Sequence, residues 1–179
     1  MPAGDDELAL AVPSVAVEPT LFPDLCVRVS LPLIQVLAGI MAKKPAFNLS
    51  VGCGSGLLEA LLLSADSSLD VVGVEVSPDI NHYLPPRCLE VVPGTWTCSE
   101  KAGLASCWLF VYPRDPRLLS RYLSVYGAAE VQIVIWIGAR LDWPVFEPFM
   151  RSDLFHPVEL PEIEELAPYE MVALLRKRN

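Results

Sequence analysis

The residues best suited to chemistry in this sequence are the three glycines of segment 52–56, which reads Gly-Cys-Gly-Ser-Gly. The segment follows an expected strand at 47–51 and precedes a leucine-rich stretch that begins at Leu57. Glycine lets a backbone approach a ligand closely and adopts the positive φ of a tight turn. A helix that begins directly after such a turn presents free N–H groups to a ligand. This order of segments is typical of a loop that holds a nucleotide or a nucleoside.

A carboxylate follows at the spacing that such a site requires. Glu75 ends the apolar segment 71–75 and lies 19 residues beyond Gly56. In nucleotide-binding sheets, an acid about 20 residues after the loop accepts hydrogen bonds from the ribose hydroxyls. We therefore expect Glu75 to bind a ribose. The alternative is that the glycines only form a tight turn and that Glu75 is a solvated strand end.

The elements that must position these residues alternate between strands and helices. Segment 70–76 is apolar at nearly every residue, as in strands that are buried on both faces of a parallel sheet. Strands are expected at 47–51, 70–76, 89–92, 108–112, 131–137 and 169–176, with a weaker one near Val158, and helices at 31–43, 57–65, 116–126 and 143–150. The fold class is therefore expected to be α/β, a doubly wound, mostly parallel sheet of six or seven strands with helices on both faces.

Length and proline placement indicate the domain organisation. The chain has 179 residues, enough for one domain with a sizeable core. Residues 1–24 contain four prolines and five acids, which predicts an extended or partly disordered arm. Residues 25–179 are expected to form a single domain.

The charge balance limits the possible partners. The net charge is −9 and the pI is about 4.6, so the chain has few cations with which to bind a phosphate backbone, and a nucleic-acid partner is not expected. No apolar run approaches the roughly 20 residues that span a bilayer, and no secretory leader is visible, so no membrane association is expected. A cytoplasmic location is predicted, with the nucleus as the alternative.

No metal site is expected. The five cysteines include no Cys-x-x-Cys pair, and only two histidines accompany them, so no zinc-binding spacing is recognisable. The cysteines are expected to be free thiols in a reducing compartment. His82 is a candidate base seven residues after Glu75, although a surface or capping role is the favoured interpretation.

Two segments carry a family resemblance. Residues 48–56, Asn-Leu-Ser-Val-Gly-Cys-Gly-Ser-Gly, closely resemble the first motif of the class I S-adenosyl-L-methionine (SAM)-dependent methyltransferases, and residues 74–78, Val-Glu-Val-Ser-Pro, resemble the second. The resemblance extends thinly from about residue 33 to residue 176. Leu57 occupies the place of the last glycine of the dinucleotide fingerprint, which disfavours a nicotinamide-dependent oxidoreductase.

The resemblance implies a Rossmann-like fold, SAM as the cofactor and a set of contacts to it. The glycine loop would line the methionine and ribose side, Glu75 would hold the ribose, and Val76 would pack on the adenine. Thr95 would bond to the adenine and Trp96 would cover it. The residues expected to bind the cofactor are Ser50, Gly52, Cys53, Gly54, Ser55, Gly56, Glu75, Val76, Thr95 and Trp96.

Residues 110–116, Phe-Val-Tyr-Pro-Arg-Asp-Pro, occupy the place of the fourth motif, where the family binds its substrate. Tyr112 and Asp115 are the polar residues expected to act in catalysis. The alternative is that the prolines shape a turn and that Asp115 caps the helix 116–126.

Two positions depart from the family pattern. Ser50 replaces an acid two residues before the first glycine, and the stretch that matches the third motif, 92–96, contains no acid. Two functions are therefore predicted. The first is a SAM-dependent methyltransferase that acts on a small molecule or a protein. The second is a non-catalytic methyltransferase-like module that serves a binding partner.

Overall fold

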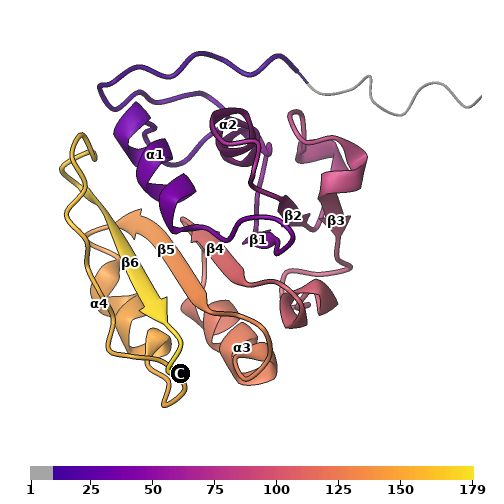
Figure 1. The fold of residues 1–179 in the computed structure, drawn as a ribbon, viewed down its shortest axis with the longest axis vertical. Coiled ribbons are helices and arrows are strands. Elements are labelled where there is room, and N and C mark those ends of the chain that lie inside the picture. Colours follow the sequence, from indigo (N-terminus) through magenta and orange to yellow (C-terminus); the bar gives the residue numbers. More distant parts are fainter. Residues whose placement is uncertain (1–9) are drawn as a thin grey trace, which may run out of the picture.

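A six-stranded sheet in the order β3-β2-β1-β4-β5-β6 organises residues 10–179, the part of the chain that the computed structural model describes (Figure 1). The first five strands pair in parallel, and β6 pairs antiparallel with β5. The strands are β1 Asn48–Val51, β2 Val71–Glu75, β3 Leu89–Val91, β4 Cys107–Val111, β5 Ile133–Ala139 and β6 Glu170–Arg176. The predicted α/β sheet, mostly parallel and with six or seven strands, is confirmed, with six strands.

Helices cover both faces of this sheet. Helices α1 (Leu31–Ile40) and α2 (Leu57–Ala65) pack on one face, and α3 (Pro116–Tyr126) and α4 (Trp143–Phe146) pack on the other. Four short 3-10 helices lie in the connections, namely η1 Pro78–Ile80, η2 Pro86–Cys88, η3 Glu100–Gly103 and η4 Glu147–Met150. None of the helices in the described range is long and apolar enough to span a bilayer.

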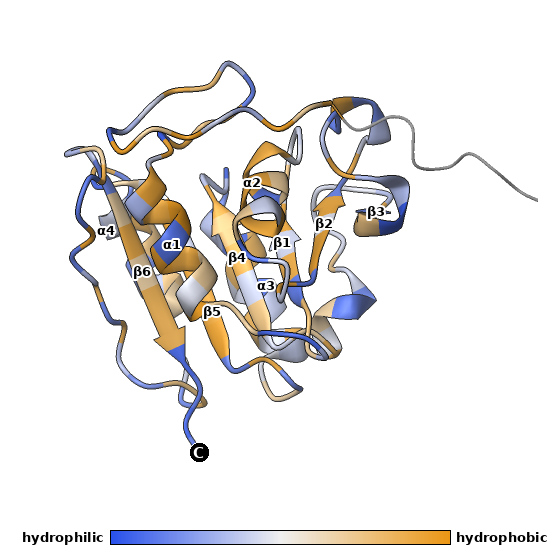
Figure 2. Ribbon diagram, turned by 45° about the horizontal axis from the view of Figure 1, so that its top comes forward, coloured by the Kyte–Doolittle hydropathy of each residue, from blue (hydrophilic) through white to orange (hydrophobic). Residues whose placement is uncertain are grey.

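The alternation of side chains along each strand divides the core into two halves. On β4, Cys107 and Leu109 contribute to the half beneath α1 and α2, whereas Trp108 and Phe110 contribute to the half beneath α3. Figure 2 shows the central strands mostly in the hydrophobic colour, as expected for strands that are covered on both faces.

The two longest helices begin where the sequence places their caps. The Ser30 hydroxyl accepts a hydrogen bond from the Leu33 amide at 3.2 Å, and Asp115 caps α3. Helix α1 ends at Ile40 rather than at residue 43, because the Asn48 side chain binds both the amide and the carbonyl of Ala42 outside the helix. The weaker strand expected near Val158 is an isolated bridge between Glu159 and Leu174.

The N-terminal segment runs along the edge of the molecule beside α1 and α2 (Figure 1). Within it, Thr20 forms an antiparallel bridge to Val29, and the Ala16 carbonyl accepts a hydrogen bond from the Leu31 amide. The first nine residues of the expected arm lie outside the described range. The Asp24 carbonyl accepts the Ser55 hydroxyl, which brings this segment to the glycine loop and the candidate site.

Candidate cofactor and substrate site

A cavity of about 520 Å³ opens at the carboxyl ends of the parallel strands. Val51 at the end of β1, Glu75 at the end of β2 and Tyr112 after β4 all line it. Strand β1 lies between β2 and β4, so the connections on its two sides run in opposite directions. In open α/β sheets the ligand binds at this point, where the direction of winding reverses.

The glycine loop forms one wall of this cavity through its backbone. Gly52, Gly54 and Gly56 have φ angles of 74°, 56° and 77°, a region that disfavours residues with a Cβ. The amides of Gly52 and Cys53 both donate to the Val74 carbonyl, which fixes the turn against β2. A Cβ at Gly52 or Gly54 would meet nothing within 4 Å, and both residues line the cavity. The bare backbone at these positions therefore faces open space that a ligand can fill.

The Glu75 carboxylate is fixed against this loop. Its Oε2 accepts the Gly54 amide at 3.0 Å, and its Oε1 accepts the Val76 amide at 2.7 Å. A carboxylate has about four acceptor positions, so about two remain for further donors. Glu75 also lines the cavity, so these positions suit the two hydroxyls of a ribose.

Apolar side chains continue the wall beyond Glu75. Val76, Ile80 and Trp96 are 39%, 45% and 42% exposed, and all three line the cavity together with Thr95. This apolar surface beside a hydroxyl group suits a flat heterocycle that has one polar edge.

Four residues of the predicted cofactor set are not among the residues that line the cavity. Cys53 packs so closely on β2 that a Cβ at Gly73 would lie 2.6 Å from its sulfur. Burial raises the pKa of Cys53, which keeps it a thiol. The Ser55 hydroxyl donates to the Asp24 carbonyl at 3.0 Å. The remaining two are Gly56, against Asn81 and Leu84, and Ser50, against α2.

Ser50 contacts a carboxyl group that the sequence analysis did not identify. The buried Ser50 hydroxyl donates to Glu59 Oε1 at 2.5 Å, and Glu59 is only 1% exposed. Burial raises the pKa of Glu59 to about 7, against the smaller opposing effect of the Ser50 hydrogen bond. The second oxygen, Oε2, has no hydrogen-bond partner among the described residues. The carboxyl group missing at position 50 is thus present beside it, on α2.

Tyr112 lies on the other side of the cavity in a strained conformation. Its φ is 47°, which is rare for a residue with a bulky side chain and is typical of functional sites. Its hydroxyl donates to Glu170 Oε1 at 2.9 Å, and the same oxygen accepts the Arg28 amide at 3.0 Å. Glu170 is fully buried, and its Oε2 also lacks a partner among residues 10–179.

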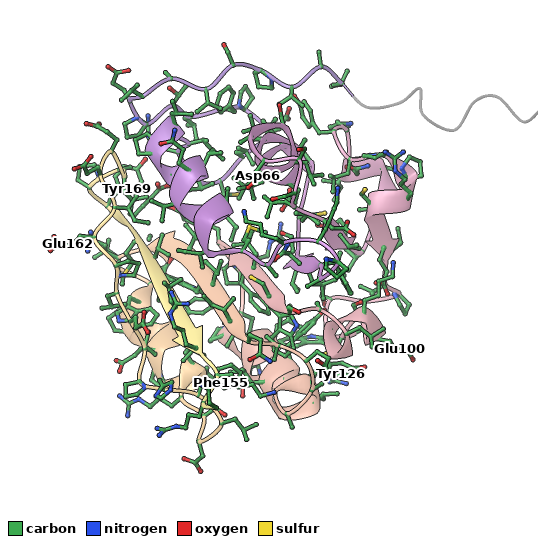
Figure 3. All side chains as sticks on the ribbon, viewed as in Figure 1. Asp66, Glu100, Tyr126, Phe155, Glu162 and Tyr169 are labelled. Atoms are coloured by element: carbon green, nitrogen blue, oxygen red, sulfur yellow. The ribbon has the colours of Figure 1, made fainter. Side chains whose placement is uncertain are left out.

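The N-terminal segment is tied to the same end of β6. The Arg28 side chain donates to the hydroxyl of Tyr169, which is labelled in Figure 3, at 2.5 Å. Cys26, two residues earlier, lines the cavity. The segment thus holds Glu170 in place and contributes directly to the cavity wall.

Asp115 lines the cavity and also caps α3. Its carboxylate accepts the Arg117 amide at 2.9 Å and pairs with the Arg117 guanidinium at 2.5 Å. The same guanidinium lies 5.0 Å from the centre of the Trp96 ring. The capping role considered as the alternative is therefore present in the structure, and a catalytic role stays a prediction.

Two substitutions of Asp115 separate its cap from its charge. Asp115→Ala is expected to lower the Tm by roughly 2–5 °C, because the helix loses its side-chain cap. Asp115→Asn retains an oxygen for the Arg117 amide and is expected to stay within about 1 °C of the parent, because exposed ion pairs contribute little. Thermal unfolding followed by circular dichroism measures both. An equal loss in the two variants would show that the charge, not the cap, stabilises the helix.

The remaining candidates for chemistry lie outside this cavity. His82 is exposed and is not among the lining residues. His156 lines a second cavity, of about 540 Å³, which shares no residue with the first. All five cysteines are free, and no group of three metal-ligating side chains occurs within residues 10–179.

The residues missed by sequence reasoning differ in the signal they left. Glu59 had a local signal, since it is the single charged residue of the leucine-rich helix Leu57–Ala65. Glu170 and Cys26 had none, because they reach the site through contacts between segments that are far apart in the sequence.

Comparison with known proteins agrees with this architecture. No protein-family model and no curated protein sequence matches the chain. Among solved structures, the chain is similar to precorrin-6y C5,15-methyltransferase from Geobacter metallireducens, with a TM-score of 0.64 and 10% identity over 94% of this chain and 100% of that one. It is also similar to the methyltransferase domain of the bacterial protein CtHen1-C, with a TM-score of 0.56 and 16% identity over 82% and 95%.

A third similar structure was solved with a ligand. CalO1, a methyltransferase in calicheamicin biosynthesis, was determined in a form with bound S-adenosyl-L-homocysteine (SAH). Its TM-score is 0.58 and its identity is 13%, over 82% of this chain and 53% of that one. Because the identities are so low, these similarities establish a shared fold and nothing more specific.

Proposed function

Because the chain has the Rossmann-like fold of the class I SAM-dependent methyltransferases, we propose that it binds SAM over the glycine loop and transfers the methyl group to a small molecule or a protein. One observation carries the proposal. Two glycines with positive φ and open space above them share a cavity wall with a carboxylate that retains free acceptor positions.

The residues present suit each part of such a cofactor. Glu75 offers acceptors for the ribose hydroxyls, and the amide of Gly54 holds its carboxylate in position. Val76, Ile80 and Trp96 form the apolar surface for the adenine. The loop has glycine where a side chain would otherwise occupy the space for the methionine portion.

The protein's part in methyl transfer is alignment. SAM supplies a methyl group on a positively charged sulfur, which is already an activated leaving group. The chain must then hold the nucleophile in line with that methyl group and exclude water. The Tyr112 hydroxyl directs its proton to Glu170, so its oxygen can accept a hydrogen bond from a substrate N–H or O–H. Burial and the Glu170 carboxylate raise the pKa of Tyr112, which keeps it protonated.

A non-catalytic binding module is the second candidate. It is favoured by Asp115, whose carboxylate is engaged by the amide and guanidinium of Arg117. In such a module, Tyr112 would serve only to close the cavity.

Calorimetric titration with SAM, SAH and NAD in parallel tests the cofactor. We expect SAM and SAH to bind and NAD not to bind, because Leu57 closes the loop where dinucleotide sites have glycine. Incubation with SAM that carries a tritiated methyl group, in protein and small-molecule extracts, then tests catalysis. Binding without transfer would favour the binding module, and no binding at millimolar concentration would exclude the methyltransferase.

Replacing Glu75 tests the ribose contact. Glu75→Ala is expected to weaken SAM binding by about 1–3 kcal/mol, the usual loss when a charged acceptor of buried donors is removed. Glu75→Gln keeps one acceptor oxygen and should lose less. Glu130→Ala, at an exposed site that does not line the cavity, is the matched control. An unchanged affinity in Glu75→Ala would show that this residue is not the ribose ligand.

A further inference from the structure

Glu59 is a buried acid directly behind the proposed cofactor loop, and its partners do not satisfy it. Its Oε1 accepts a single hydrogen bond, from the Ser50 hydroxyl at 2.5 Å, and its Oε2 accepts none from residues 10–179. A carboxyl group that is 99% buried and has an unpaired oxygen destabilises the fold, and it does so most when it is ionised. Such a group in a native protein requires an explanation.

The surroundings of Glu59 contain acids and thiols rather than cations. The groups that act on its carboxyl are Ser50 from β1, its own backbone amide, Cys53 from the glycine loop and Glu75 from β2. Helix α1, which packs against α2, has no charged residue. Glu59 forms no ion pair in the part of the chain that the structure describes. Glu59 interacts electrostatically with Glu75, which lines the cavity, so a positive charge in that cavity would also act on Glu59.

We propose that Glu59 is a charge switch for the cofactor, whose ionised carboxylate stabilises bound SAM more than bound SAH. This inference rests on the proposed function. SAM carries a positive sulfonium that SAH lacks, whereas the two share the same ribose, adenine and amino-acid portions. An anion behind the loop therefore distinguishes them, and the loss of the sulfonium charge on methyl transfer weakens the hold on the product.

The burial of Glu59 sets the pH range over which the protein distinguishes SAM from SAH. Burial raises the pKa of Glu59 to about 7, so its charge changes within the physiological range. A cation above the loop favours the ionised form, so SAM binding releases a proton from Glu59. Each unit by which SAM lowers this pKa makes binding about tenfold tighter at high pH than at low pH.

Calorimetry at a series of pH values tests the switch, with SAM and SAH as the two probes. Between pH 5.5 and pH 8, the ratio of the SAH Kd to the SAM Kd is expected to rise by about three- to tenfold. At pH 6.5, SAM binding to the unmodified protein should release about half a proton more than SAH binding, measured in two buffers of different ionisation enthalpy.

Variants assign the effect to this residue. Glu59→Gln should make the ratio independent of pH, and Ser50→Ala should move the change to higher pH by removing the bond that favours the ionised form. The exposed Glu130→Gln serves as the control and should behave like the parent.

The possible outcomes separate this inference from the proposed function. If both ligands bind with a ratio and a proton count that do not change with pH, or if Glu59→Gln keeps the parent's pH dependence, the switch is overturned and SAM binding stands. If neither ligand binds at any pH, the proposed function fails, and the switch fails with it. Proton release by the unmodified protein decides the question even if Glu59→Gln does not fold.

Discussion

Replacing Gly56 with alanine is expected to lower the free energy of unfolding by about 2–5 kcal/mol, through a strained backbone and an overpacked side chain. The φ of Gly56 is 77°, and the added Cβ would lie 2.7 Å from Asn81 Oδ1 and 2.8 Å from Leu84 Cγ. Asn81 and Leu84 hydrogen-bond to each other, so neither can move away freely. Urea unfolding followed by circular dichroism measures the loss.

Two other glycines serve as controls. Gly39 lies exposed in α1, and a Cβ there would meet nothing within 4 Å, so Gly39→Ala is expected to stabilise the protein by about 0.5–1 kcal/mol. Gly54→Ala incurs only the backbone strain of about 1–2 kcal/mol, and its methyl group should weaken SAM binding because it enters the cavity. If Gly56→Ala were as mild as Gly54→Ala, the packing against Asn81 and Leu84 would not be the reason for glycine.

The sequence predicts the fold well where local signals determine each element. Helix α3 begins where Asp115-Pro116 indicates, because a side-chain cap and a first-turn proline both act within a few residues. The glycine loop and Glu75 are likewise identified by one strand, one helix and a spacing. The mostly parallel pairing of the sheet follows from the alternation of strands and helices, since a helix between two strands favours a parallel crossover.

What the sequence does not predict depends on contacts between distant segments. The end of α1 is set by the side chain of Asn48, which lies beyond the helix. The environment of Tyr112 depends on Glu170, 58 residues later, and on Arg28, near the other end of the chain. Asp115 was equally suited to a cap and to catalysis by its residue type, and the structure shows the cap because the Arg117 amide lies within reach.

Glu59 gives the second large expected effect, on stability as a function of pH. Burial raises its pKa from 4.5 in the unfolded chain to about 7 in the folded protein. Between these values the folded state binds more protons than the unfolded state, so the free energy of unfolding falls as the pH rises. The stability that the protonated Glu59 carboxyl contributes, relative to its ionised form, is fully present below pH 4.5 and is lost as the pH rises through 7.

We expect this loss to be about 3 kcal/mol, since one pKa unit corresponds to about 1.4 kcal/mol. Glu59→Gln removes the titrating group while retaining an acceptor for Ser50. Between pH 4.5 and pH 7.5, the free energy of unfolding of this variant should therefore fall by about 3 kcal/mol less than that of the parent. Urea unfolding at several pH values in this range, in the absence of ligand, measures the difference between the two curves. The exposed Glu130→Gln should run parallel to the parent.

The same carboxyl group thus connects stability to ligand binding. Above pH 7 the ligand-free protein contains a buried anion without a cation beside it, and a cationic ligand above the loop should restore part of the lost stability. SAM should therefore raise the Tm more than SAH does at pH 8, and the two ligands should converge at pH 5.5. Parallel curves for the parent and Glu59→Gln without ligand would instead show that Glu59 titrates near its unfolded value, and the difference between SAM and SAH would then need another source.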